Sequence, residues 1–88
     1  MGDQKERKQI ILGNEFDDNL RVALRATLIE FGGEVIENEW VPDFEHLEVT
    51  INGLTLDVEA ETYIGLSIHG EPNLVQRIAA RVRERMTT

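Results

Sequence analysis

Two histidines set among carboxylates are the residues of this chain best suited to chemistry. His46 and His69 are the only histidines, and both lie in a stretch rich in Asp and Glu. Imidazole nitrogens and carboxylate oxygens together can bind a divalent metal or transfer protons near neutral pH. No HExxH or similarly spaced ligand motif is present. A metal-binding or small-ligand module that uses His46 and neighbouring carboxylates is therefore one of three hypotheses for the function.

Other catalytic patterns are not matched. The chain has no cysteine, which excludes a thiolate metal site and a cysteine nucleophile. Its one serine, Ser67, lies in a predicted strand without the sharp turn of a nucleophile elbow. The glycines form neither a GxGxxG motif nor a phosphate-binding loop. We therefore expect no enzymatic activity and no cofactor.

The acidic residues are concentrated in the middle of the chain. None of the nine Lys and Arg residues lies in 26–76, and we call this segment the cation gap. The formal net charge of −8 opposes general binding to nucleic acid or to an anionic membrane, since both need a positive field. The gap holds eleven carboxylates: Glu30, Glu34, Glu37, Glu39, Asp43, Glu45, Glu48, Asp57, Glu59, Glu61 and Glu71.

The length and composition predict one small domain. With 88 residues and 41% apolar content, the chain can form a single hydrophobic core. Residues 1–8 form a charged stretch without the apolar segment of a signal peptide, and we expect a disordered tail there. Residues 9–88 are predicted to form a single α+β domain. No apolar run reaches the roughly 18–20 residues that span a bilayer, and the lack of cysteine favours a cytoplasmic location.

Two amphipathic helices are predicted. The first covers 14–31, with Asn14 as its N-cap and Gly32-Gly33 as a left-handed stop. Pro72 opens the second at its first helical position. The buried stripe of the first comprises Phe16, Leu20, Ala23, Leu24, Thr27, Leu28 and Phe31. The stripe of the second comprises Leu74, Val75, Ile78, Ala79, Val82 and Met86.

The segment between the helices is predicted to form a sheet. Asn52-Gly53 is typical of a two-residue hairpin turn, and it pairs Val49 with Leu56 and Glu48 with Asp57. A strand over 34–41 precedes this hairpin, with Ile36 and Trp40 facing inward and a turn at Pro42-Asp43. A strand over 62–69 follows. We expect it to pair Val58 with Ile64 through a connection at 60–62, although one long bent strand is an alternative.

The predicted order is (β)αββββα, in which the first strand is a possible edge strand over 9–12. Each helix has one apolar stripe and the hairpin has one apolar face. These faces are buried most simply in a two-layer α+β sandwich, with both helices on one side of a mostly antiparallel sheet. The outer face of the sheet is then polar: Glu37, Glu39, His46, Glu48, Thr50, Thr55, Asp57, Glu59, Tyr63, Ser67 and His69.

This outer face is the predicted site. A solvated sheet face is commonly polar, and that is the plain structural alternative. However, Glu48 opposite Asp57 places like charges across two strands, which costs a few tenths to about 1 kcal/mol. His46 opposite Glu59 is interpreted as a simple ion pair. The residues predicted to bind a partner are Glu37, Glu39, His46, Glu48, Asp57, Glu59 and Tyr63.

The basic residues of the helices suggest a second surface. Arg77, Arg81 and Arg85 recur every four residues and predict a basic stripe on the outer side of the second helix. A solvated helix face explains such a stripe, as does contact with the acidic sheet of a second copy. We do not expect nucleic-acid binding, because the basic residues are few and no aromatic residues lie between them.

Three functions follow from these patterns. The first is a small acidic interaction module that binds a basic protein, as acidic inhibitors, antitoxins and immunity proteins do. This comparison rests on charge and size alone. The second is a homodimeric structural protein, and the third is the metal-binding or small-ligand module. We favour the first, because the cation gap and the Glu48–Asp57 pair both concern the sheet face.

Overall fold

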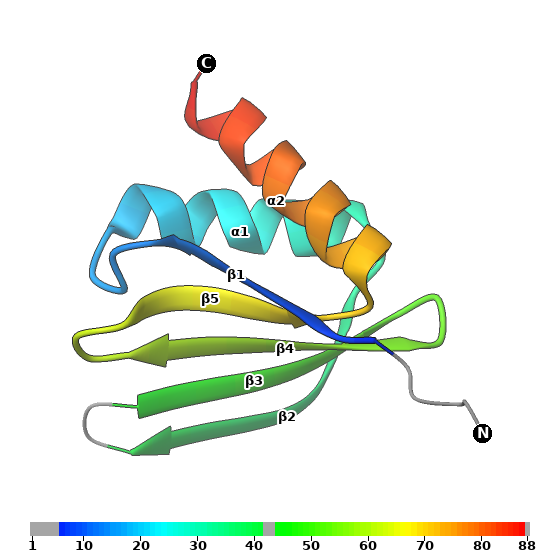
Figure 1. Cartoon of the computed structure of the whole chain (residues 1–88), viewed down its shortest axis with the longest axis horizontal. Coiled ribbons are helices and arrows are strands. Elements are labelled where there is room, and N and C mark those ends of the chain that lie inside the picture. Colours follow the sequence, from blue (N-terminus) through cyan, green and yellow to red (C-terminus); the bar gives the residue numbers. More distant parts are fainter. Residues whose placement is uncertain (1–5, 42–43, 88) are drawn as a thin grey trace.

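The computed structural model describes residues 6–41 and 44–87, with side chains for all of these except Trp40 and Val41. It shows the predicted α+β sandwich. A five-stranded antiparallel sheet carries both helices on one side (Figure 1). The strands are β1 (Lys8–Gly13), β2 (Glu34–Val41), β3 (Phe44–Ile51), β4 (Leu54–Glu61) and β5 (Gly65–Gly70), and the helices are α1 (Asp18–Glu30) and α2 (Pro72–Met86).

The strand order across the sheet is β1-β5-β4-β3-β2, so β1 and β2 form its two edges. The predicted edge strand is β1, and it includes Lys8, which we expected in the tail. Residues 1–5 of that tail, like the predicted turn at 42–43, lie outside the described residues. Neither described helix has the length and apolar composition that crossing a membrane requires.

The core lies between the helices and the inner face of the sheet, and it includes residues of β3, β4 and β5. Its fully buried side chains include Ile51, Leu56, Ile68 and Ile78. α2 packs against α1, β1 and β5. The strand residues that face this core alternate with the residues of the outer face.

The β3–β4 hairpin is confirmed in its turn and its register. Asn52 and Gly53 have φ values of 51° and 81°, as a type I′ turn requires. Val49 pairs with Leu56 and Glu48 pairs with Asp57. Turn chemistry and hydrophobic alternation select the same register here, which explains why this prediction succeeds.

The predicted pairing of the last strand is wrong. β5 begins at Gly65, the connection is Thr62–Ile64, and Val58 pairs with Ile68. The observed register is shifted by an even number of residues, so the same side chains face the core in both cases. Gly65 has a φ of 119°, and a Cβ there would lie 2.5 Å from the carbonyl oxygen of Gly13. This close approach of two backbones fixes where β5 begins.

Helix α1 begins later than predicted. Its N-cap is Asp17, whose carboxylate accepts a hydrogen bond from the Leu20 N–H at 3.1 Å. The Asn14 side chain instead accepts from the Phe16 N–H at 2.7 Å and forms a separate turn. Phe16 therefore lies outside the helix and is exposed. Gly32, with a φ of 77°, confirms the left-handed stop.

Two further side-chain placements differ from the prediction. A bulge in β2 between Val35 and Glu37 changes the alternation. It places Val35 opposite Val49, on the side of the helices, and leaves Ile36, which we expected to face inward, as the extra residue of the bulge with an exposed side chain. Met86, at the end of α2, is exposed instead of buried. The side chain of Trp40, predicted to face inward, lies outside the described residues.

Candidate functional site: the outer sheet face

The outer face is organised as two neighbouring rows that cross all five strands. The first row is Gln9, His69, Asp57, Glu48 and Glu37. The second row is Ile11, Ser67, Glu59, His46 and Glu39. Six of the seven predicted site residues belong to these rows. The sequence therefore predicted which residues share the face, although the predicted register of β5 was wrong.

Three acidic residues lie side by side in the first row. Glu37 pairs with Glu48 across β2 and β3, and Glu48 pairs with Asp57 across β3 and β4. Directly opposed like charges on neighbouring strands destabilise a sheet. Among the residues that the structure describes, no ion pair or hydrogen bond reaches the carboxylates of Glu37 and Glu48. The predicted like-charge pair is thus part of a longer run.

Asp57, in contrast, has partners within the chain. Arg7, just before β1, forms an ion pair with one of its carboxylate oxygens. The other oxygen lies 2.8 Å from Nε2 of His46. The sequence-based interpretation gave His46 a simple ion pair with Glu59. Glu59 does lie directly opposite His46, but the imidazole reaches diagonally to Asp57.

The environment of His46 favours its protonated form. The hydrogen bond with Asp57 raises the pKa of His46 above its ordinary value of 6.5, and partial burial opposes this effect. The charges of Asp57, Glu59 and Glu39 also raise this pKa. Nδ1 of His46 lies 3.9 Å from Glu39, so the ring lies between two carboxylates. His46 can therefore act as a cation within the acidic face.

The second histidine lies beside a different carboxylate. Nε2 of His69 is 3.1 Å from Glu59. The two imidazoles thus contact separate acids and do not converge on one point. Within residues 6–39 and 44–87, no three His, Asp or Glu side chains are arranged to hold a metal ion. The geometry gives no support to the metal-binding hypothesis.

Tyr63 lies apart from the two rows. It is in the turn between β4 and β5, its side chain is fully exposed, and its φ is 76°. A non-glycine residue in this left-handed region costs roughly 1–2 kcal/mol. Because the Tyr63 side chain is exposed, it adds nothing to the core that could offset the cost of this backbone conformation.

The arginine stripe of α2 is engaged within the chain. Arg81 and Arg85 both bind the carboxylate of Glu30, at 2.9 and 2.7 Å. Arg77 lies over the ring of Phe31, at 5.4 Å from its centroid. The stripe therefore faces the end of α1, and one carboxylate of the cation gap serves to connect the two helices.

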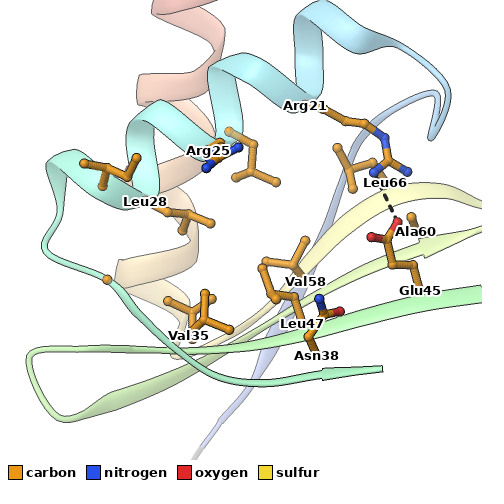
Figure 2. A pocket seen from close by; sticks show the side chains of 14 residues that line it. Arg21, Arg25, Leu28, Val35, Asn38, Glu45, Leu47, Val58, Ala60 and Leu66 are labelled. Atoms are coloured by element: carbon orange, nitrogen blue, oxygen red, sulfur yellow. Dashed lines mark hydrogen bonds and ion pairs between the residues drawn. The ribbon is translucent and has the colours of Figure 1, made fainter. Parts of the chain in front are cut away.

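A groove between α1 and the β2–β3 part of the sheet was not predicted. Figure 2 shows Arg25 and Leu28 of α1 on one side and Val35, Asn38 and Leu47 on the other. Its volume is about 570 Å³, and most of its lining is apolar. One signal was available in the sequence. Strand alternation places Glu45 on the same side as Leu47, and its carboxylate lies 3.1 Å from Arg21 at the groove.

The comparisons with known proteins add no assignment. A scan against protein-family models and searches of curated proteins and of solved structures found no match to this chain. The function is therefore argued from the geometry of the chain itself.

Proposed function

We propose that this chain is a non-enzymatic interaction module whose outer sheet face binds a basic protein. The observation that carries the proposal is the row formed by Glu37, Glu48 and Asp57. The fold does not need these three acids at opposed positions, since Thr or Lys at one of them would remove the repulsion. Cations of a bound partner would relieve the repulsion among these carboxylates, and this relief would favour binding.

The distribution of charge supports the same conclusion. Arg7 and His46 reach Asp57 at one end of the row, while the carboxylates toward β2 have no such partners among the described residues. The unpaired negative charge therefore lies at the β2–β3 side of the face. An acidic surface of this kind accelerates encounter with a basic protein and disfavours acidic ones. A cytoplasmic inhibitor, antitoxin or immunity-like protein fits this description.

A charge-matched pair of variants tests the proposal. The face variant is Glu37→Gln with Glu48→Gln, and its control is Asp18→Asn with Glu84→Gln on the helices. Each removes two carboxylates, so the net charge is the same. We expect affinity capture from the native cell extract to recover a basic protein with the wild type and the control but not with the face variant. Equal recovery with both variants, or recovery of no basic protein, would contradict the proposal.

Stability measurements supply an independent check on the same row. Glu48→Thr removes both like-charge contacts, and we expect it to raise the free energy of unfolding by a few tenths to about 1 kcal/mol. Urea titration at low ionic strength measures this change. A loss of stability would show that Glu48 serves the fold, and the argument for a partner would then fail.

A further inference from the structure

Strand β2 combines a free edge with two contrasting faces. It pairs with β3 on one side and forms the edge of the sheet on the other. The backbone N–H and C=O groups along such an edge can pair with a further strand. Figure 1 shows β2 at the opposite edge of the sheet from β1, which lies close to α2.

The inner face of β2 borders the apolar groove. Val35 is 62% exposed although it faces the side of the helices, because α1 does not cover it. Leu28 of α1 lies on the opposite side of the groove, and Leu47 of β3 lies on the sheet side with Val35 (Figure 2). Side chains from a strand beside β2 would enter this groove and bury apolar surface.

The outer face of β2 is acidic. Glu37 and Glu39 lie on this face, and both are exposed. Only the imidazole of His46, at 3.9 Å from Glu39, lies within ion-pair distance of either carboxylate among the described residues. A strand added beside β2 would place alternate side chains next to these acids.

We propose that β2 accepts an extended segment of the basic partner as a sixth strand, with basic side chains beside Glu37 and Glu39 and apolar side chains in the groove. This inference rests on the proposed function and specifies its partner. Strand addition obtains affinity from backbone hydrogen bonds and specificity from alternate side chains. The segment is therefore one in which Lys or Arg alternates with apolar residues.

Charge complementarity selects this occupant over a second copy of the chain. Two β2 strands paired antiparallel would place Glu37 and Glu39 of each copy on one face, acid against acid. The β1 edge of a second copy would present the uncharged Gln9 and Ile11 on that face, and the nearest cation there, Arg7, already forms an ion pair with Asp57. In a strand from another protein in which cations alternate with apolar residues, the cations would lie beside the acids of the outer face. Its apolar side chains would enter the groove on the inner face.

A synthetic peptide tests the pairing directly. The probe is a ten-residue peptide of alternating Lys and Val with blocked termini, and its control has the same composition in two blocks. We expect the alternating peptide to bind at least about tenfold more tightly at low salt, because only its pattern matches the two faces. Amide shifts in the NMR spectrum of the labelled protein should be largest along β2.

N-methylation separates backbone pairing from charge. In an extended strand, all Lys N–H groups point to one edge and all Val N–H groups point to the other. Only one of these edges faces β2 when the Lys side chains lie beside the acids. Of two peptides, methylated on every Lys or on every Val nitrogen, we expect one to lose binding about tenfold or more and the other to retain it.

Protein variants test the two faces separately. Glu37→Gln with Glu39→Gln should weaken peptide binding about tenfold, whereas Asp18→Asn with Glu84→Gln should not. Val35→Ser should weaken it severalfold through the groove. Val22→Ser is its control, because Val22 is equally exposed on α1 but does not line the groove. The replaced side chains are exposed, so each variant should keep the wild-type fold.

The outcomes distinguish this inference from the proposed function. If both methylated peptides bind equally and binding still requires Glu37 and Glu39, the acidic face binds cations without strand addition and only the inference falls. Absence of shifts along β2 with the alternating peptide also overturns it. If the peptide pairs with β2 while the face variant still captures the basic partner, the proposed function falls and strand addition stands.

Discussion

The protonation of His46 changes the charge of the outer face with pH. The hydrogen bond with Asp57 raises the pKa of His46, so the folded chain holds a proton more tightly than the unfolded chain does. Such a group stabilises the fold fully at a pH below its unfolded pKa, near 6.5. The contribution is lost as the pH rises through the higher folded value. The acidic face therefore becomes more negative, and less stable, as the solution becomes alkaline.

This sign predicts the behaviour of Asp57→Asn. The variant should lower the pKa of His46 in an NMR titration. Its deficit in unfolding free energy should be largest near pH 5.5 and should shrink by about 1 kcal/mol or less near pH 8.5. Urea unfolding at both pH values measures the deficit. Glu84→Gln, far from both histidines, should show no such change, and a deficit independent of pH would contradict the assignment of this hydrogen bond.

Tyr63 allows a test of strain at a single residue. Glycine adopts a φ of 76° freely, and the relief of strain exceeds the added chain entropy. We expect Tyr63→Gly to raise the free energy of unfolding by about 0.5–1 kcal/mol. Ile64→Gly, next to it in the turn, should instead lower stability. If Tyr63→Gly is as destabilising as Ile64→Gly, the Tyr63 side chain stabilises the fold, and this would contradict the argument from backbone strain.

At the scale of elements, Glu30 connects the end of α1 to α2. Hydrogen bonds from Arg81 and then Arg85 hold the pKa of this exposed carboxylate below its ordinary value of 4.5. A group with a lowered folded pKa stabilises the fold above its unfolded pKa. Its contribution disappears as the pH falls through the folded value. The contact between the helices should therefore weaken in acid.

Glu30→Gln tests this connection. The variant should melt at a lower temperature than the wild type at pH 7, and the difference should vanish in acid below the folded pKa of Glu30. High salt should reduce the difference as well, because the contact is exposed. Thermal unfolding followed by circular dichroism measures it. Glu84→Gln, which loses only the 3.2 Å contact with Arg81, should have a smaller effect, and equal effects would contradict a special role for Glu30.

The elements also show what the sequence can predict. The β3–β4 hairpin was predicted in register because the Asn52-Gly53 turn and the alternating pattern agree. The start of β5 was not, because shifting a strand by an even number of residues leaves the same side chains facing the core. The backbone contact between Gly65 and Gly13 decides that register, and it involves residues far apart in the chain.

The candidate site was predicted in composition but not in its contacts. Alternation within the hairpin placed Glu48, Asp57 and His46 on one face, as observed. The diagonal contact of His46 with Asp57 depends on side-chain conformation, which periodicity does not encode. The groove depends on how far α1 lies from β2, a distance that no local pattern determines. The cation gap thus indicated which face is acidic. Only the tertiary structure shows which of its carboxylates, such as Asp57, have a cationic partner within the chain.

At the scale of the whole molecule, the acids of β2 also protect a sheet edge. An exposed edge strand invites pairing with another copy, and natural sheets oppose this with charged residues. Glu34, Glu37 and Glu39 lie on β2, one of the two edge strands of this sheet. Their mutual repulsion across a β2–β2 contact should keep the wild-type chain monomeric at neutral pH, despite the apolar groove beside the edge.

Replacing these acids should therefore change the oligomeric state. We expect Glu37→Thr with Glu39→Thr to self-associate through β2 at micromolar concentration, because Thr favours strands and removes the repulsion. Sedimentation velocity measures this, and Asp18→Asn with Glu84→Gln controls for net charge. Adding Val35→Asp to the double variant should restore the monomer, since it places a charge on the inner face. A wild-type dimer at every salt concentration would show instead that a second copy covers this edge.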